Sequence, residues 1–384
     1  MIDWNEIRKD FPVCQNLAYF QNAGMSPVPT PVYNAITNAW KKILEYGDLD
    51  WKGDIENIEK MKAHLASIIH TSAENLAFIQ NSSLALNVVA MALKRKYGEG
   101  FNVVTMEHEF PSTNVPFASQ GIEVKYVKAK NARFNIDDIE KHIDKHTKAI
   151  VTSWVQYATG FRQDIEALGK IAKKHHLLFI VNATQALPIF EMDVEKMNID
   201  VMTASLHKWG CCGHVGAAFY TSPQYRKEFP CPIAGWLSVM PPEDDFIPTQ
   251  KDKPFVAYQS AAQYNWGTTN NQNFLGLKAS LEYMANIGFD NIRTRIFEIT
   301  SYLIQKLNEL PLTIISPIDN LDERSGIISI SLDHASNAQC FQYLESKNVA
   351  TSLRMGNIRI APSYFNNHQD VDVLVHHLKD FLKK

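Results

Sequence analysis

The sequence predicts an α/β fold in which a large domain with a mostly parallel sheet is followed by a smaller α+β domain at the C-terminal end. Between about residues 75 and 220, short apolar runs alternate with amphipathic stretches, which is typical of parallel strands joined by helices. From about residue 276 onward, helical stretches come first and short strands follow. The length of 384 residues also suits one large and one smaller core. We expect residues 15–262 to form the large domain, and residues 1–14 and 263–384 to form the small one.

The expected strands of the large domain are Phe101–Met106, Ile122–Val127, Ala149–Trp154, Leu177–Asn182, Val201–Ala204 and Ala217–Tyr220. Helices are expected between them. The clearest helix runs over Asp164–His175, because its apolar residues recur at helical spacing on one face. Two proline-rich segments interrupt the pattern and indicate long loops, at Pro230–Pro232 and Pro241–Pro254.

The small domain is expected to begin with two helices, near Leu277–Ile287 and Asn291–Leu310. Short strands follow at Gly326–Leu332, Val349–Ser352 and Ile358–Ile360. An amphipathic helix over Gln369–Leu382 closes the chain. An active site between the two domains would match the usual location of ligand pockets.

The composition is that of a globular protein, with 45% hydrophobic and 21% charged residues. The formal net charge of -3 gives no electrostatic reason to expect nucleic acid or an anionic membrane as a partner. No apolar run reaches the length that spans a bilayer, and the N-terminal residues lack a signal-peptide core. We therefore expect a cytoplasmic protein.

The cysteines show no paired spacing; they are Cys14, Cys211, Cys212, Cys231 and Cys340. An odd count without metal-ligand spacing argues against a disulfide framework and against a zinc site. We expect no metal centre, and buried free thiols at most of these positions.

The residues that indicate chemistry lie between Leu178 and Tyr220. One strand ends at Asn182, and Gln185 follows it; the next strand is followed by His207 and Lys208. Open α/β sheets bind ligands at the carboxyl ends of their strands, so both clusters are expected to face one crevice. A desolvated lysine there could act as a nucleophilic amine. The alternative for Lys208 alone is a solvated loop lysine.

This segment resembles the class V aminotransferase family of pyridoxal 5′-phosphate (PLP) enzymes, which includes cysteine desulfurases, kynureninases and isopenicillin N epimerase-like proteins. The family has a strand ending in Asp-x-x-Gln or Asp-x-x-His, and later a (Ser/Gly)-x-His-Lys-(Trp/Tyr) turn, here Ser205–Trp209. The resemblance covers nearly the whole chain and implies the PLP-dependent transferase fold type I. It makes Lys208 the lysine that holds the cofactor as a Schiff base, and it places Gln185 at the cofactor's phenolic oxygen. Ser205 and His207 are further expected cofactor contacts.

Two upstream segments extend the resemblance. Tyr19–Gly24 is similar to the family's N-terminal strand and turn, which makes Asn22 a candidate for substrate binding. Asn81-Ser82-Ser83 before a helical run resembles the family's phosphate-binding segment. Capping hydroxyls and free backbone N–H groups at a helix N-terminus suit the cofactor phosphate, which makes Ser82 and Ser83 candidates. An ordinary helix cap has the same geometry.

Three further positions are assigned by the resemblance. Phe110, in a Glu-Phe-Pro-Ser segment, is the candidate for stacking on the pyridine ring, and His108 is its rival. Gln156 and Tyr157 would lie near the cofactor, and Tyr157 is also a candidate for substrate binding, although core or turn roles are an equal alternative. Thr268 belongs to a Gly-Thr motif that reaches the partner subunit's phosphate in the family, so a homodimer with composite active sites is expected.

Near the C-terminus, Ser352–Pro362 resembles the family's Ser-x-Arg-x-Gly-x-x-Arg strand. The second arginine of that motif typically holds a substrate carboxylate, and a guanidinium fork suits this contact. Arg359 is therefore the expected anchor, and Arg354 is a further candidate. A surface ion pair is the alternative for each.

Position 182 departs from the family, because it is Asn where the family has Asp. The resemblance implies that a carboxylate there keeps the cofactor's pyridine nitrogen protonated, and an amide cannot compensate that charge. Three interpretations follow, in this order: chemistry with a weaker electron sink, an ordinary but slower enzyme, or cofactor binding without much catalysis. Cysteine desulfurase activity is not expected, because Cys340 falls in a predicted helix rather than in a loop.

The sequence thus predicts a PLP-dependent enzyme that acts at the α-amino group of an amino-acid-like substrate. Transamination, elimination (including C–S cleavage) and epimerisation share their first steps, and the sequence does not separate them. A non-catalytic PLP-fold protein with a binding or regulatory role is the alternative class. Asn182 favours that alternative, whereas Lys208, Gln185 and Arg359 argue for the enzyme.

Overall fold

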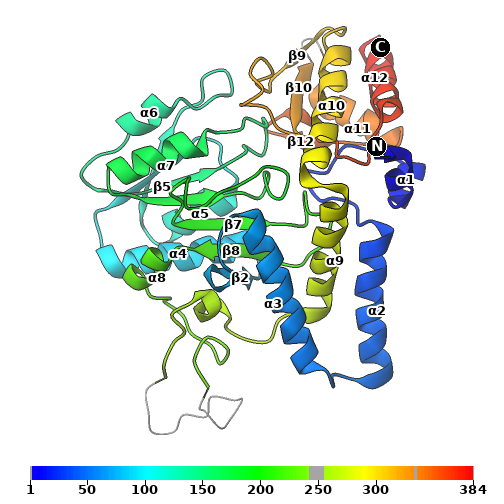
Figure 1. Cartoon of the computed structure of the whole chain (residues 1–384). Coiled ribbons are helices and arrows are strands. Elements are labelled where there is room, and N and C mark those ends of the chain that lie inside the picture. Colours follow the sequence, from blue (N-terminus) through cyan, green and yellow to red (C-terminus); the bar gives the residue numbers. More distant parts are fainter. Residues whose placement is uncertain (1, 242–254, 333–334, 384) are drawn as a thin grey trace.

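The computed structural model of the chain describes residues 2–241, 255–332 and 335–383 (Figure 1). These residues form a seven-stranded sheet, a four-stranded sheet and a two-stranded sheet, with helices packed around them. No helix in these ranges combines the length and the apolar character that a bilayer crossing requires.

The seven-stranded sheet has the order β2-β8-β7-β6-β5-β3-β4. Its strands are β2 (Leu76–Ile79), β3 (Asn102–Met106), β4 (Glu123–Val127), β5 (Thr147–Ser153), β6 (Leu178–Asn182), β7 (Val201–Ser205) and β8 (Ala217–Thr221). Only β8 runs against its neighbours β7 and β2, so the sheet is mostly parallel, as the sequence predicted. All six expected strands are present. The edge strand β2 was not predicted.

Both faces of this sheet are buried, because alternate residues of each strand enter two different hydrophobic clusters. In β5, Ile150 belongs to one cluster and Val151 to the other. The helices on these faces are α4 (Ser82–Tyr97), α5 (Pro111–Ser119), α6 (Ile136–Lys141), α7 (Ile165–Lys174) and α8 (Pro223–Glu228). Helix α7 matches the clearest predicted helix, and Asp164 caps it by accepting from the Ala167 N–H at 2.9 Å.

The N-terminal part forms helices that the sequence did not predict, α1 (Trp4–Lys9), α2 (Thr30–Tyr46) and α3 (Trp51–Ile68). Helices α2 and α3 both pack against α9 (Asn271–Ile287), and Figure 1 shows these three long helices beside the large sheet. Several apolar residues of α2 are exposed, including Trp40 and Leu44.

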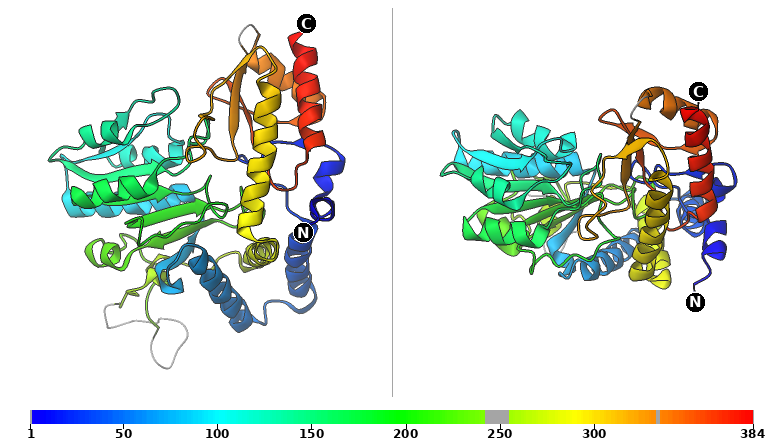
Figure 2. Two further views of the ribbon diagram at one scale, coloured as in Figure 1. Left: turned by 45° about the horizontal axis from the view of Figure 1, so that its top comes forward. Right: turned by 90° about the horizontal axis from the view of Figure 1, so that it is seen from above.

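The C-terminal part is built on the four-stranded antiparallel sheet, ordered β12-β13-β10-β9. Its strands are β9 (Leu312–Ile314), β10 (Ile328–Leu332), β12 (Ser352–Arg354) and β13 (Asn357–Ile360), and its helices are α10 (Phe289–Leu307), α11 (Asn337–Ser346) and α12 (His368–Leu382). Figure 2 shows this sheet to one side of the large one. The helices and the strands β10 and β13 agree with the prediction, whereas β9 was not expected.

The predicted strand Val349–Ser352 is divided between two sheets. Its first half, β11 (Val349–Ala350), pairs in parallel with β1 (Ala18–Tyr19), and its second half begins β12. Gln21 forms a further bridge to Ala361. The N-terminal segment is thus joined to the C-terminal part. Arg8 reinforces this junction, because its Nη1 and Nη2 atoms donate to the Asp370 carboxylate at 2.7 and 2.8 Å.

The predicted loops agree with the structure as far as it describes them. Pro230–Pro232 lies outside helices and strands, and the segment 242–254 of the second predicted loop lies outside the described residues. Short 3₁₀ turns occur at Pro12–Gln15, Ala73–Asn75 and Ala261–Tyr264. The division into domains at residues 15 and 262 stays a prediction.

Candidate active site

A cavity of about 300 Å³ lies where β5, β6 and β7 end, next to the β12–β13 hairpin. Eleven of the candidate residues line it: Ser82, Ser83, Phe110, Tyr157, Asn182, Gln185, Ser205, His207, Lys208, Arg354 and Arg359. The other lining residues are Ala23, Gly24, Asn81, Ser112, Ser153, Val155 and Thr184. The lining contains two arginines and a lysine but neither Asp nor Glu, so the cavity suits an anionic ligand.

Lys208 follows β7 in a turn and extends into this cavity. Burial of the amine, together with the nearby positive charges of Arg359 and Arg354, lowers the pKa of Lys208 to about 7. A substantial fraction of the amine is therefore neutral near neutral pH, which is the state that attacks a carbonyl carbon. The turn is held from behind, because Asn22 Nδ2 donates to the Lys208 carbonyl at 3.2 Å.

The N-terminus of α4 carries a cluster of hydroxyl groups. The Ser82 hydroxyl lies 2.8 Å from that of Ser205, 3.2 Å from that of Thr203 and 3.4 Å from that of Thr184. Asn81 caps the helix by accepting from the Leu84 N–H at 2.9 Å. The first N–H groups of a helix have no partner within it, and hydroxyls beside them add donors. This donor set fits a phosphate group.

Gln185 and Phe110 also suit a flat, phosphorylated cofactor. The Gln185 Oε1 atom accepts from Trp209 at 2.8 Å and Nε2 donates to the Ala23 carbonyl at 2.9 Å, which leaves the second amide N–H for a ligand. Phe110 is 42% exposed, and Lys208 Nζ lies 5.4 Å from its ring centroid. Its ring can therefore cover one face of an aromatic ligand, whereas His108 is not among the lining residues.

Asn182 is fixed by two hydrogen bonds. Its Oδ1 atom accepts from the Thr184 backbone N–H at 3.1 Å, and its Nδ2 atom donates to the Thr113 hydroxyl at 3.0 Å. Because a backbone N–H needs an acceptor, these contacts set the orientation of the amide. Thr113 was not predicted as a site residue. Its hydroxyl also contacts a second residue that was not predicted.

That residue is Glu109, whose carboxyl group is buried just behind the cavity wall. It accepts from the Ser153 backbone N–H at 2.6 Å and from the Ser153 hydroxyl at 2.5 Å, and it also contacts the Thr113 hydroxyl. Burial raises the pKa of Glu109 to about 7, and the hydrogen bonds from Ser153 oppose this shift. The sequence contained one signal for this residue, because Glu109 is the Glu of the Glu-Phe-Pro-Ser segment that follows β3.

Arg359 lies on β13 and is only 2% exposed. Its Nε atom donates to Ser352 Oγ at 3.0 Å and its Nη1 atom to the Tyr157 carbonyl at 2.7 Å, while Nη2 has no partner among the described residues. Burial, with a smaller contribution from Arg354, lowers the pKa of Arg359 to about 9. A buried guanidinium without a counter-ion calls for an anionic ligand.

Three candidates lie elsewhere. Asn22 is fully buried and does not line the cavity; it supports Lys208, and its Oδ1 atom has no partner among the described residues. Gln156 holds a turn, since it accepts from the backbone N–H groups of Ala158 and Thr159 at 2.6 and 2.7 Å. Thr268 lines a neighbouring cavity of about 1050 Å³, which shares Asn81, Ser205 and His207 with the first.

All five cysteines are free, and none lines the candidate site. Cys340 lies in α11, fully buried in the hydrophobic cluster of the small sheet, where burial raises the pKa of its thiol to about 12. Cys211 and Cys212 are also buried, so the prediction of buried free thiols holds for three of the five.

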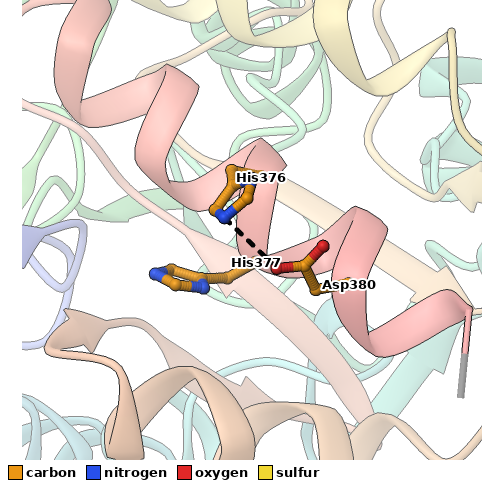
Figure 3. Close-up of side chains that lie close together, drawn as sticks. All are labelled: His376, His377 and Asp380. Atoms are coloured by element: carbon orange, nitrogen blue, oxygen red, sulfur yellow. Dashed lines mark ion pairs between the residues drawn. The ribbon is translucent and has the colours of Figure 1, made fainter.

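One group of potential metal ligands occurs in the described residues, on α12 (Figure 3), and none of its residues lines the cavity. It consists of His376, His377 and Asp380, and His376 Nε2 lies 3.2 Å from the Asp380 carboxylate. His376 is exposed to solvent, so this group is accounted for as a surface ion pair between residues one helical turn apart.

Comparisons with known proteins identify a family and several relatives. The family model described as Aminotransferase class-V matches residues 18–368. A probable cysteine desulfurase from Pyrococcus abyssi is 26% identical over 343 residues, covering 85% of this chain and 81% of that protein. The uncharacterized aminotransferase YcbU from Bacillus subtilis is 24% identical over 370 residues, covering 95% of each.

Solved structures show the same fold. The apo cysteine desulfurase from Thermococcus onnurineus NA1 has a TM-score of 0.89 and 22% identity, over 100% of this chain and 99% of that one. The cystine C–S lyase C-DES, in complex with its product cysteine persulfide, has a TM-score of 0.87 and 18% identity, over 96% and 99%. At these identities the likeness establishes the architecture alone.

Proposed function

Since the chain belongs to the aminotransferase class-V family of PLP enzymes, with the fold type I architecture that the sequence predicted, we propose that it binds PLP in the cavity and acts at the α-amino group of an amino acid. The observation that carries the proposal is the buried guanidinium of Arg359, which has no counter-ion among the described residues and whose Nη2 atom has no partner there. It lines the same cavity as the amine of Lys208, which is partly neutral near neutral pH. An amino acid has a carboxylate for the first group and an amino group beside it.

The lining residues have complementary tasks. Lys208 would hold the cofactor covalently, the hydroxyl cluster at α4 would bind its phosphate, Phe110 would cover its ring, and Gln185 would donate to its phenolic oxygen. When bound, PLP supplies an electron sink for negative charge that develops at the substrate Cα. Arg359 would orient the substrate through its carboxylate. Lys208 Nζ, with its pKa of about 7, would accept and return the Cα proton.

Reaction type is the finer part of the proposal. The names of the sequence relatives favour cysteine desulfurase, an activity that is not expected from the place of Cys340 in the sequence. The positions of the cysteines support that judgement, because no thiol lines the cavity and Cys340 is locked in α11. We therefore favour transamination, elimination or epimerisation, none of which requires a protein thiol.

A second candidate, a PLP-binding protein without catalysis, is favoured only by the neutral Asn182. The uncompensated cations of the cavity count against it, because a site that binds the cofactor alone has no use for an unpaired Arg359.

We also propose that the protein is a homodimer. Apolar side chains are exposed along α2 and the turn that follows it, namely Tyr33, Trp40, Leu44, Tyr46 and Leu49. Several large exposed apolar side chains on one helix and the turn after it favour a protein interface there. Thr268 lies in the large cavity beside the site, which would be consistent with a residue that serves the partner's phosphate.

Reduction with borohydride followed by peptide mass spectrometry tests the core of the proposal. The pyridoxyl group is expected on Lys208; a label on another lysine, or none in PLP-saturated protein, would overturn the assignment. Incubation with a panel of amino acids, with and without a keto-acid acceptor, then identifies the reaction. Turnover without acceptor indicates a lyase or epimerase, and a strict requirement for acceptor indicates an aminotransferase.

A further inference from the structure

We propose that the cavity selects an amino acid whose side chain carries a second anionic group, such as a carboxylate or a sulfinate, and that Arg354 binds this group. The inference rests on the proposed function, because it assigns the α-carboxylate to Arg359. It deepens that function by naming the class of substrate.

The two arginines share one face of a β-hairpin. Ser352 of β12 pairs with Arg359 of β13, and Arg354 pairs with Asn357. Side chains alternate between the two faces of a strand, so Arg354 and Arg359 point to the same side. They are diagonal neighbours, whose Cα atoms lie about 7 Å apart in such a pair. Their charges affect each other, since Arg354 contributes to the lowered pKa of Arg359.

No described residue compensates these charges. The arginines that form ion pairs in the described ranges are Arg8, Arg133, Arg162, Arg293 and Arg295. Lys208 adds a third basic group to the same lining, which contains no acidic side chain. Like charges gathered in a partly desolvated cavity are unfavourable until anions enter it. The cofactor phosphate has its own donors at α4, which leaves both guanidiniums to the substrate.

The unused donors of the two side chains suit two separate anionic groups. Arg359 has only Nη2 without a partner, which serves one oxygen of a carboxylate. Arg354 donates from Nη1 to the Leu353 carbonyl at 2.8 Å, and its Nε and Nη2 atoms form the edge that binds a second carboxylate in bidentate geometry. A substrate with one anionic group would leave one guanidinium without a counter-ion.

The test uses two probes that lack an amino group and therefore bind without turnover. Succinate has two carboxylates, and succinamate is its isostere with one carboxylate replaced by a neutral amide. Isothermal titration into the PLP-loaded protein should give a dissociation constant for succinate roughly tenfold or more below that for succinamate, as expected for a charged hydrogen-bonded pair. Equal dissociation constants would overturn the inference.

Variants locate the effect. Arg354→Met should abolish the preference for succinate while leaving succinamate binding nearly unchanged, and Arg354→Lys should keep part of it. Arg293→Met, which removes an ion-paired arginine of α10 outside the cavity, is the matched control and should change neither constant. If Arg354→Met weakened both probes equally, the two arginines would share one carboxylate, and the inference would be wrong. If Arg359→Met changed neither constant, the proposed function itself would fail.

Discussion

At position 182 an amide occupies the end of β6, held by Thr184 on one side and Thr113 on the other. Its nitrogen and oxygen are both engaged, so the residue contributes a fixed dipole and no charge. A buried carboxyl group, that of Glu109, contacts the Thr113 hydroxyl. The side chain at the end of β6 that lines the cavity is thus neutral, and this carboxyl group lies outside the lining.

Asn182→Asp should restore a carboxylate to the wall and raise the pKa of the cofactor's pyridine nitrogen. One pKa unit corresponds to about 1.4 kcal/mol, enough to change rates severalfold. If the amide tunes the site, the variant gains side transamination or racemisation; if the amide is a tolerated defect, the native reaction simply accelerates. Chromatography of the products and a pH titration of the cofactor's absorption separate the two. Unchanged spectra, rates and products would contradict both accounts.

Glu109 predicts a pH dependence of stability. Because its folded pKa is raised from 4.5 to about 7, the stability it contributes is complete below about pH 4.5 and is lost as pH rises through about 7. The loss is at most on the order of 3 kcal/mol. Glu109→Gln should therefore flatten the decline of the melting temperature of the apo protein over this range, as measured by calorimetry.

The exposed carboxylate Glu195 provides the control, since Glu195→Gln should leave the slope as it is. A residual slope is expected in every variant, because burial also raises the pKa of Asp200, to about 6. A Glu109→Gln protein with the full wild-type slope would show that this carboxyl group is ionised over the whole range.

The candidate residues that the sequence identified are those that belong to short motifs. Lys208, Gln185 and the serines of α4 could be found because motif order along the chain places them at strand ends and a helix start. Thr113 offered no such motif, and for Glu109 the motif gave its position but not its burial, because the environments of both residues are made by Ser153 and Asn182, which are distant in sequence. Burial created by long-range contacts leaves no periodic signal.

Among the elements, α4 combines a structural and a functional role. Asn81 caps the helix, and the same turn presents Ser82 and Ser83 to the cavity. Asn81→Ala should cost about 1 kcal/mol of stability and also weaken the retention of PLP, because the frayed first turn no longer aligns its N–H groups. Thermal unfolding and dialysis against cofactor-free buffer measure the two effects.

The matched control is the cap of α6, where Asn135 accepts from the Asp137 N–H at 2.8 Å, away from the cavity. Asn135→Ala should lower stability by a similar amount and leave PLP retention unaltered. Equal loss of PLP in both variants would mean that general destabilisation, rather than the α4 turn, governs cofactor release.

Among the strands, the central ones of the large sheet were predictable because their apolar runs are bounded by polar residues. Strand β11 was merged with β12 because the change of sheet at Thr351 leaves no break in the apolar pattern. The edge strand β2 and the short β9 are defined mainly by their partners β8 and β10. Pairing partners far along the chain cannot be read from local composition.

For the whole molecule, the apolar outer side of α2 is the feature that a monomer does not explain. Leu44 is 84% exposed. Leu44→Glu should place a charge in the proposed interface and produce monomers, as measured by sedimentation velocity at micromolar concentration. Leu321, which is 63% exposed in the C-terminal part, is the control, and Leu321→Glu should leave the dimer intact.

The Thr268→Ala variant should remain a dimer but lose PLP more readily, because it lacks the hydroxyl that we propose contacts the cofactor phosphate in the partner subunit. A wild-type protein that is monomeric at micromolar concentration and fully active would contradict both the interface and the composite site.

The segment that carries β1 links the two ends of the chain to the turn that carries Lys208. Ala18 pairs with Val349, and a few residues later Asn22 and Ser26 donate to the carbonyls of Lys208 and His207. During synthesis, β1 leaves the ribosome long before its partner strand exists. At about 5–20 residues per second this delay is on the order of tens of seconds. The contacts of Asn22 and Ser26 together with the β1–β11 pairing are therefore complete only after nearly the whole chain has been translated, so that a truncated or stalled nascent chain would lack part of the support of Lys208.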